Sequence, residues 1–566
     1  MLLSKIGIVS RTYRHVARYR QILGVLFKYG FDDLINTLKI GQYVEVGLQL
    51  ISRNRREHVE TLTRAQRVRM VLEELGPTFI KLGQVLSTRP DLIPAEFVAE
   101  LSRLQEHVPP FPFEQAREII ESELRRPLHE VFARFDETPL AAASIGQVHR
   151  ATLREGDEVV VKVQRPGIRR IVEVDLEILL HLAVLLERHV EGAELHSPTR
   201  IVQEFSRVME QELQYTVEAS HLERFAMQFI DDRTIYVPKV YREATTSRVL
   251  TLEYVEGIRP NDLHALESAG LDRRIIARRG AELILRQIFI HGFFHADPHP
   301  GNIFILPGNV VCYLDFGMMG RLDLRTRELF ADLVFAIAAR DATATTAAIL
   351  RLAERDDSFE PDLRQLERDV AELIDIHVVS ELKRLDFGRL LQQIVDLTRR
   401  HRIRIPPDLV VMGKCLTTVE GMGRVLDPEF DIVSAARPYV RKVKLDRLRP
   451  TRVARDIHEA GIQLAQFASE IPDGVRDLLR LAKRGQLKMG FEHRGLERMI
   501  DTHERISNRI AFAIVVAALI VGSSLVVRSQ IPPLWHEIPV VGLAGFVTAG
   551  VMGFWLLISI LRHGRM

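Results

Sequence analysis

The segment from His291 to Gly317 most narrowly limits how this chain can fold. It places Asn302 five residues after Asp297 in a proline-rich loop, and two apolar runs then lead to an Asp-Phe-Gly sequence that begins at Asp315. A hairpin between the runs would bring Asn302 and Asp315 together, so that two oxygen ligands converge on one metal ion. This order is typical of phosphoryl-transfer sites, in which Asp297 would accept or orient a hydroxyl proton while Asn302 and Asp315 bind Mg²⁺. A proline-rich turn followed by a chance Asp-Phe-Gly is the less favoured alternative.

The composition is that of a globular protein in a reducing compartment. The chain has 566 residues, of which 46% are apolar and 27% charged, enough for about three or four domains. Its two cysteines, Cys312 and Cys415, provide neither a disulfide framework nor zinc-ligand spacing. The formal net charge of +2 says little about partners, and we expect no nucleic-acid partner.

Residues 128–165 are typical of the small lobe of a protein kinase, with two strands joined by a loop and then a β-branched strand. In ordinary kinases a glycine-rich loop joins the first two strands and lets backbone amides approach the phosphates. Alanines occupy much of that loop here, which removes positive-φ freedom and makes the loop stiffer. We expect nucleotide contacts from this loop and from the following strand, at Ala141, Ala142, Ala143, Ser144, Ile145, Gly146 and Lys162.

We expect an α+β, two-lobed protein-kinase-like fold, with the small lobe at residues 128–257 and the large lobe at residues 258–430. The strand that ends at Glu253 suits the hinge between the lobes. Backbone groups of Glu253 and Val255 would there hydrogen-bond the adenine ring.

Two further helices are expected at residues 171–190 and 198–231, and the second contains Glu212 and Glu218. Either glutamate could pair with Lys162. Helical spacing does not choose between them, because a separation of six residues places them about 120° from a shared face.

Ahead of the small lobe, residues 61–127 are expected to form a helical extension. A helical pattern that breaks at Gly76 carries Lys81 and Gln84 on one face. Composition alone makes two ordinary surface residues an equal alternative. Residues 1–60 are basic and amphipathic, so they would lie on an anionic membrane surface or form a solvated helical face.

Six motifs occur together in this chain: Lys81-Leu82-Gly83-Gln84, AAASIGQVH, Lys162 in its strand, ELQYTVEA, HADPHPGN and LDFG. This combination closely resembles the UbiB family of atypical kinase-like proteins, which is linked to ubiquinone (coenzyme Q) biosynthesis. By motif the resemblance covers roughly residues 60–340. It implies binding of ATP with Mg²⁺, ATPase activity, and support of a complex that makes a lipid quinone.

The resemblance also assigns a regulatory lid, made of Lys81, Gln84 and Glu212. In the family, the Lys-x-Gly-Gln segment lies over the site where a protein substrate would dock, and its lysine contacts a Glu-x-Asp motif. Carried across, Lys81 becomes the partner of Glu212, and Glu218 becomes the partner of Lys162. Gln214 stands in place of the family aspartate, so one carboxylate rather than two would hold the lid.

The residues after Asp-Phe-Gly argue against an ordinary protein kinase. The chain passes directly into a helical pattern, with no Ala-Pro-Glu and no Ser, Thr or Tyr before Thr326. A small or membrane-dissolved substrate, or simple ATP hydrolysis, fits better. We therefore expect a kinase-like ATPase with Lys162, Glu218 and Asp297 as catalytic residues. The alternatives are a kinase that phosphorylates a prenylated phenol or other lipid, and a non-enzymatic, nucleotide-dependent scaffold or lipid chaperone.

The C-terminus carries two uncharged apolar segments, residues 510–527 and 540–561. At 1.5 Å per residue they would span about 27 and 33 Å, close to the roughly 30 Å of a hydrocarbon core. We therefore expect a two-helix transmembrane hairpin, and a buried soluble hairpin is the less favoured alternative. Gly545, Ala549 and Gly553 form a stripe of small residues that would serve the hairpin itself or a homodimer contact.

Charges around these segments predict the topology. Cations flank the outer ends, whereas the connecting loop has only Arg528, balanced by Glu537. The positive-inside rule then places both ends and the kinase-like domain in the cytoplasm, at a cell inner membrane. The expected linker at residues 431–509 is basic between Arg437 and Arg455, where it would contact anionic headgroups. Expected partners are membrane lipids, quinone precursors and other quinone-biosynthesis proteins.

Overall fold

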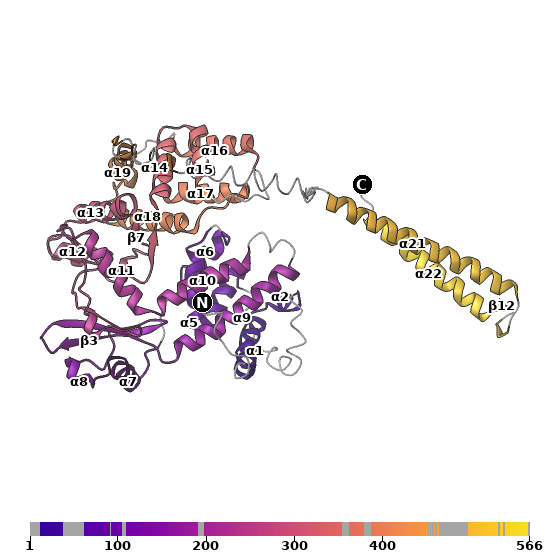
Figure 1. Ribbon diagram of the computed structural model, residues 1–566, viewed down its shortest axis with the longest axis horizontal. Helices are drawn as coiled ribbons and strands as arrows, with labels where there is room; N and C mark the ends of the chain where they lie inside the picture. The colour runs from indigo at the N-terminus through magenta and orange to yellow at the C-terminus, as the bar shows by residue number, and fades with distance from the viewer. Residues whose placement is uncertain are drawn as a thin grey trace, which may run out of the picture. The chain divides into compact units, whose positions relative to one another are not determined.

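The computed structural model divides into two compact units, Met1–Arg455 and Asp456–Met566, and each is described by itself (Figure 1). The described residues are 12–37, 62–90, 92–104, 109–190, 197–353, 361–378, 387–447, 449–450, 452, 454, 458, 461–462, 496–529, 532–535 and 538–563.

Short helices form the N-terminal extension of the first unit. They are α1 (Thr12–Lys28), α2 (Asp32–Thr37), α4 (Arg64–Leu75), α5 (Pro77–Ser87) and α6 (Ala95–Leu101). A capping box starts α4, because the side chains of Thr63 and Gln66 bond each other's backbone N–H groups. Gly76, at a φ of 95°, ends α4, and Pro77 begins α5. The predicted break in this helical pattern is therefore present.

The apolar face of α1 is occupied within the protein. Ile22 and Val25 are buried in a cluster that includes residues of α4 and α5. Arg18 Nε also pairs with Asp175 Oδ1 at 2.7 Å. These apolar side chains of α1 therefore pack within the protein, and contact of the N-terminal segment with a membrane surface stays a prediction. Residues 1–11 and 38–60 of that segment lie outside the described part of the chain.

A five-stranded antiparallel sheet forms the small lobe, with strand order β1-β3-β4-β6 and β2 paired with β3. The strands are β1 (Phe132–Phe135), β2 (Ala141–Ala142), β3 (Gly146–Leu153), β4 (Glu158–Gln164) and β6 (Val249–Glu253). The valines of β4, Val159, Val161 and Val163, are buried in a cluster with residues of α7 (Phe113–Leu124), next to the short helix α8 (Leu128–Val131). Because side chains alternate along a strand, Lys162 lies on the opposite face.

The small lobe continues into three helices, α9 (Ile168–His189), α10 (Pro198–Glu212) and α11 (Tyr215–Gln228). The expectation of one continuous helix over residues 198–231 is wrong. Gln214 has an extended backbone, with φ −128° and ψ 90°, and it precedes the first turn of α11. Glu212 ends α10 and Glu218 lies in α11, so the 120° separation expected for one continuous helix does not apply to them.

The large lobe combines small sheets with many helices. Strands β8 (Ile303–Leu306) and β9 (Val310–Tyr313) form an antiparallel hairpin, and β5 (Ile235–Tyr236) pairs with β9 in parallel. Strand β7 (Phe293–His295) pairs with β10 (Met319–Arg321). The helices are α12 (Leu263–Ser268), α13 (Arg273–Arg286), α14 (Leu324–Ala338), α15 (Ala342–Leu352), α16 (Leu363–Val378), α17 (Phe387–Arg400), α18 (Pro407–Leu426) and α19 (Ile432–Arg447).

Helix α19 extends the large lobe beyond the boundary expected at residue 430. Its apolar side chains, including Ile432 and Val440, are buried in the same core as residues of α13 and α14. Arg447 pairs with Asp332 of α14 at 3.1 Å. Part of the positive charge that was expected to face lipid is thus paired with a carboxylate of the same protein.

The second unit contains two long helices, α21 (Leu496–Arg528) and α22 (Val540–His563), which lie side by side (Figure 1). The short strands β11 (Leu534–Trp535) and β12 (Ile538–Pro539) pair between them. The stripe of small residues faces α21, because a β-carbon at Gly545 would overlap Ser523 Oγ and Ala549 is buried. In this structure the stripe therefore serves the helix pair.

Among the described residues, one helical segment is long and apolar enough to cross a membrane, Ile510–Arg528, with a mean hydropathy of 2.8. It belongs to α21, which begins well before the span expected at residue 510. The described apolar part of α22, Val540–Leu556, is shorter than a span. A second membrane crossing therefore stays a prediction.

Candidate active site

The residues of the proline-rich loop and of Asp-Phe-Gly come together at the ends of β7, β8 and β9. The Leu314 N–H donates to the Asn302 carbonyl at 3.0 Å, which places Asn302 beside Asp315. The Asn302 amide donates to the Asp297 carbonyl at 3.4 Å. The Gly317 N–H donates to Asp315 Oδ1 at 2.8 Å. The hairpin thus brings together the two residues that the spacing predicted as oxygen ligands, and metal binding by them stays a prediction.

His295 ties both sides of this loop together, although the sequence did not single it out. Its Nδ1 accepts the Asp297 N–H at 3.2 Å, and its Nε2 bonds the Asp315 carbonyl. Because Nδ1 accepts, Nε2 must donate, and the ring is the neutral Nε2–H tautomer. Burial lowers the pKa of His295, in agreement with a neutral ring. The imidazole therefore positions Asp297 and Asp315 through their backbones.

Lys162 pairs with Glu218, since Nζ lies 2.9 Å from Oε2. Burial alone would lower the pKa of Lys162, but the carboxylates of Glu218 and Asp315 outweigh it and raise that pKa. Burial would likewise raise the pKa of Asp315, yet the charge of Lys162 and the Gly317 N–H lower it to about 2. Lys162 and Asp315 therefore remain charged at neutral pH.

The other glutamate, Glu212, pairs with Lys81 of α5 at 2.6 Å. Both side chains are largely enclosed, with 11% and 14% exposed, so Lys81 is not an ordinary surface lysine. A β-carbon at Gly317 would lie 3.8 Å from Glu212 Oε1, which places the ion pair against the Asp-Phe-Gly turn. Gln84 is half-buried one turn away, and its carbonyl accepts the Ser87 hydroxyl at 2.7 Å.

The glycine of the Lys-x-Gly-Gln segment lies where α5 packs closely against leucine side chains. A β-carbon at Gly83 would overlap Leu104 and lie 2.8 Å from Leu72. A side chain at this position would therefore displace the ends of these two leucine side chains.

The alanine-rich loop divides into a partly open half and a buried half. Ala141 is exposed and pairs with Val148 in the sheet, and the Ala143 N–H closes the turn by donating to the Gly146 carbonyl at 2.8 Å. Ser144 and Ile145 are buried, and Ile145 packs among residues of α9 and α10. The loop tip is thus anchored inward, and nucleotide contact by Ala141–Gly146 stays a prediction.

Tyr215 is a site residue that the sequence argument missed. It is 1% exposed, and Lys162 Nζ lies 5.1 Å from the centre of its ring. A β-carbon at Gly146 would come within 2.5 Å of its hydroxyl, so glycine is required there. Burial raises the pKa of Tyr215. Its position directly after the break at Gln214 was hidden, because no residue pattern marks that break.

The expected hinge follows β6. Glu253 is tied to the neighbouring segment, since its carboxylate accepts the Tyr236 hydroxyl at 2.6 Å and the Lys239 N–H at 3.0 Å. Ile258 and Ile305 exchange backbone hydrogen bonds of 3.1 and 2.8 Å, which fasten the hinge to β8 of the large lobe. Adenine contact by Glu253 and Val255 stays a prediction.

Lys414 of α18 is a second residue that the sequence argument missed. Its Nζ lies 3.9 Å from Asp297 Oδ1, beyond hydrogen-bonding distance but close enough for charge attraction. The next residue, Cys415, donates its thiol to the His295 carbonyl at 3.2 Å. Burial lowers the pKa of Lys414. The lysine stands far from every motif in the sequence, so only the fold could place it here.

The donor set suits a cation that binds together with phosphates. In the part of the chain that the structure describes, no group of three or more His, Cys, Asp or Glu side chains could hold a metal ion alone. Asn302 and Asp315 offer two oxygen ligands beside Lys162. Mg²⁺ is commonly held by one or two protein carboxylates, with phosphate oxygens and water completing its shell. These residues therefore fit Mg²⁺ with a bound nucleotide.

Three family models match the chain. The ABC1 atypical kinase-like domain matches residues 103–349, the UbiB helical domain residues 370–431, and the ABC1/UbiB kinase-like C-terminal domain residues 494–562.

Curated relatives match over most of their length. A "Probable protein kinase UbiB" of Pseudomonas fluorescens is 35% identical, covering 82% of this chain and 87% of the relative. A "Probable protein kinase UbiB" of Marinobacter nauticus is 34% identical, and the match covers 86% of this chain and 91% of the relative. An uncharacterized protein from a hydrogenase 1 5′ region of Clostridium pasteurianum is 32% identical, covering 97% and 100%. A solved structure of Rv3197 with erythromycin, from Mycobacterium tuberculosis, is 24% identical with a TM-score of 0.46, covering 66% of this chain and 94% of that one.

Proposed function

Because the chain belongs to the ABC1/UbiB family of kinase-like proteins, we propose that it is a membrane-anchored ATPase that binds Mg·ATP and supports ubiquinone (lipid quinone) biosynthesis. The observation that carries this proposal is the Lys162–Glu218 ion pair beside Asp315. In protein kinases the equivalent pair and the Asp of Asp-Phe-Gly must both be in place before the phosphates are held productively.

Each residue has a role that its surroundings support. Lys162, held by Glu218, binds phosphate oxygens, and the low pKa of Asp315 keeps its carboxylate ready for a cation at neutral pH. Asn302 and Asp315 would hold Mg²⁺, which would supply charge neutralisation for the transferred phosphoryl group. Asp297 orients the attacking water or hydroxyl, with its backbone fixed by His295.

Hydrolysis is favoured over transfer to a protein because the chain leaves little room for a peptide platform. Strand β10 ends at Arg321, and α14 begins at Leu324 with Asp323 as its N-cap. The lid pair Lys81–Glu212 lies against the same turn. A peptide substrate would have to displace this pair.

Membrane attachment is proposed through the second unit. Ile510–Arg528 is apolar along its length, and only 6% of that segment is buried within the protein, as expected for a helix that faces lipid. The pairing of α21 with α22 supports an inserted hairpin. A kinase-like domain anchored in this way would lie close to substrates that dissolve in the membrane. This agrees with the family link to a lipid quinone.

Nucleotide binding can be tested by thermal unfolding of the purified full-length protein with and without Mg·ATP. A ligand that binds only the folded state raises the melting temperature. We expect a rise for the wild type and none for Asp315→Asn. The matched control, Asp446→Asn, removes a carboxylate from α19 and should keep the rise. Equal stabilisation of Asp315→Asn would contradict the metal assignment.

Product analysis separates the proposal from a lipid kinase. If Mg·ATP and a prenylated phenol yield a stable phosphorylated lipid, the lipid-kinase alternative replaces hydrolysis. If quinone synthesis in cells survives both Asp297→Asn and Asp315→Asn, a non-enzymatic scaffold replaces both.

A further inference from the structure

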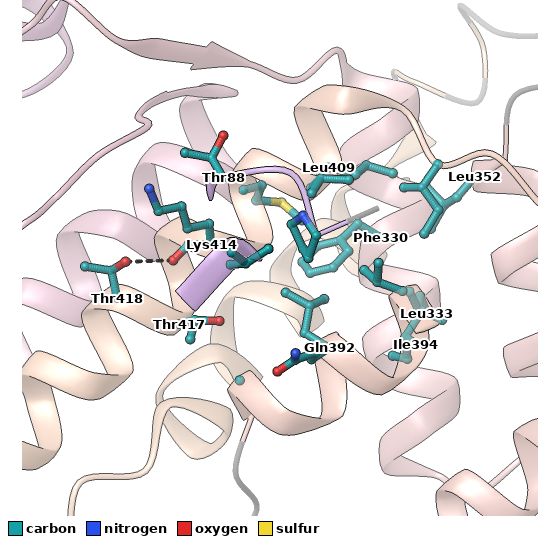
Figure 2. Close-up of a pocket in the computed structure, with 18 of the residues that line it drawn as sticks. Thr88, Phe330, Leu333, Leu352, Gln392, Ile394, Leu409, Lys414, Thr417 and Thr418 are labelled. Carbon is teal, nitrogen blue, oxygen red and sulfur yellow. Dashed lines mark hydrogen bonds between the residues drawn. The ribbon is translucent and has the colours of Figure 1, made fainter. Parts of the chain in front are cut away.

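A cavity of about 250 Å³ lies in the first unit next to Lys414 (Figure 2). It is bounded by the end of α5, by α6 and by helices α14, α15, α17 and α18 of the large lobe. Its volume is near the lower end of the roughly 300–1,000 Å³ typical of small-molecule sites. None of the nucleotide-site residues predicted from the sequence lines it.

The two sides of the cavity differ in chemistry. Phe330, Leu333 and Leu352 lie on one side, while Lys414 and Thr418 lie on the other (Figure 2). Such a cavity suits a molecule with an apolar body and one polar end. The apolar side would exclude water from a hydrocarbon chain.

The polar side offers few hydrogen-bond donors. The hydroxyls of Ser87 and Thr88 donate to carbonyls of α5, both at 2.7 Å. Those of Thr417 and Thr418 donate to carbonyls of α18, at 3.0 and 2.9 Å. The protons of these four hydroxyls are therefore already used in hydrogen bonds within the protein. Toward a ligand the hydroxyl oxygens can only accept hydrogen bonds.

Lys414 is left as the charged donor, and the amide of Gln392 is a neutral donor in the same lining. Of the described residues that line the cavity, it alone carries a charge. Its nearest carboxylate, on Asp297, is 3.9 Å away, so the ammonium can still bond an oxygen at hydrogen-bonding distance. A cationic head would be repelled there, whereas an oxyanion would gain a charge-assisted hydrogen bond.

We propose that this cavity binds a single-chain amphipathic molecule, with its hydrocarbon chain among Phe330, Leu333 and Leu352 and its anionic oxygen head on Lys414. The head would then lie beside the loop that carries Asp297. The proposal does not depend on nucleotide hydrolysis, and it is tested without ATP.

The test is photo-cross-linking of full-length protein with a decanoate that carries a diazirine on its chain, followed by peptide mass spectrometry. Site mapping separates the cavity from α21 and α22, which any apolar probe would label. We expect labelled peptides from α14 and α17. Loss of one hydrogen bond to a charged group lowers binding affinity by about tenfold. Lys414→Met should therefore lower cavity labelling by about tenfold. Lys414→Arg should retain most of it, and Lys442→Met is the matched control.

A second variant tests the cavity without touching its charge. Val98→Phe, on half-buried Val98 of α6, should fill part of the space and abolish labelling, whereas Val425→Phe, at an exposed position of α18, should not. Thermal unfolding would confirm that both variants fold.

Two further probes keep the hydrocarbon chain and change the head group to a quaternary ammonium or to a phenol, which is neutral at pH 7. Equal cavity labelling by either probe would overturn the anionic head. Labelling confined to α21 and α22, or unchanged by Lys414→Met and Val98→Phe, would overturn the site.

Discussion

Lys81 of the N-terminal extension and Glu212 at the end of α10 form an ion pair of 2.6 Å that is almost closed to solvent. The pair lies against Gly317, in the turn that holds the Asp315 carboxylate. A contact between the extension and the candidate active site therefore depends on two opposite charges. A change that breaks the Lys81–Glu212 ion pair should therefore also increase the mobility of the Asp-Phe-Gly turn.

The first prediction concerns the energy of the Lys81–Glu212 pair. Removing one partner leaves an enclosed charge, so Lys81→Met or Glu212→Gln alone should each lower the free energy of unfolding by about 2 kcal/mol. The double variant should lose less than the two single losses together, by about 1 kcal/mol. Chemical denaturation of the four proteins measures this coupling.

The exposed pair of Lys28 and Glu74 is the control for that cycle, since 27% and 36% of these side chains are exposed. Solvent screening should reduce its coupling to a few tenths of a kcal/mol. Equal coupling in the two cycles would show that the lid pair is no more than a surface contact.

The pairing of these residues was predicted from a resemblance, while the geometry around them was not. Helical spacing left Glu212 and Glu218 equivalent, because the break at Gln214 carries no glycine or proline. A side chain following such a break, such as that of Tyr215, cannot be placed by counting residues. By contrast, Asn302 and Asp315 were placed correctly together, since a short hairpin allows only one register.

The position of Lys414 could not be predicted from the sequence for a different reason. Its neighbour Asp297 lies in a distant motif, and the contact depends on how α18 packs on β7 and β10. Local periodicity predicts that α18 is a helix, but it does not say which loop the helix faces. The C-terminal apolar segments, whose length is a local property, were predicted as helices within a few residues at their inner ends.

The second prediction concerns Glu218, which positions the Lys162 ammonium. Glu218→Gln removes the charge that holds Lys162, so ATP turnover should fall by at least about tenfold, the equivalent of roughly 1.4 kcal/mol. Glu223→Gln on the same helix is the control, because Glu223 pairs with Arg242 at the surface. Steady-state phosphate release of the two variants measures the difference. Similar rates would show that the Lys162–Glu218 pair has no part in turnover.

The third prediction concerns acid stability of the small lobe. His149 is 0% exposed, and burial lowers its pKa below the ordinary value of 6.5. Its neutral form is therefore favoured by folding. This contribution is complete above pH 6.5 and is lost as the pH falls from there through the folded-state pKa.

His149→Asn keeps a donor near the Asp136 carbonyl, which His149 Nδ1 contacts at 2.9 Å. We expect this variant to be less stable than the wild type at pH 7.5 and to lose less stability between pH 7 and pH 5. Denaturant unfolding across that range measures both slopes. Parallel slopes would assign the acid sensitivity to other groups.

The fourth prediction concerns topology. Cys312 and Cys415 are both buried, and burial raises the pKa of Cys312 to about 12, so neither thiol should react with a maleimide in the folded protein. A new cysteine at exposed Ser529, in Ser529→Cys, should be labelled from outside by a membrane-impermeant maleimide. Val425→Cys, on the first unit, should be labelled only after the membrane is opened. The reverse pattern would invert the topology, and labelling of both from outside would exclude a membrane hairpin.

The central claim is that the Lys162, Asn302 and Asp315 arrangement hydrolyses Mg·ATP. The most direct measurement is phosphate release by the purified full-length protein with Mg·ATP, beside Asp315→Asn and the control Asp446→Asn, with and without anionic liposomes. We expect turnover in the wild type and in Asp446→Asn, and loss of that turnover in Asp315→Asn. Phosphate release that persists in Asp315→Asn, or none from a wild-type protein that binds Mg·ATP, would contradict it.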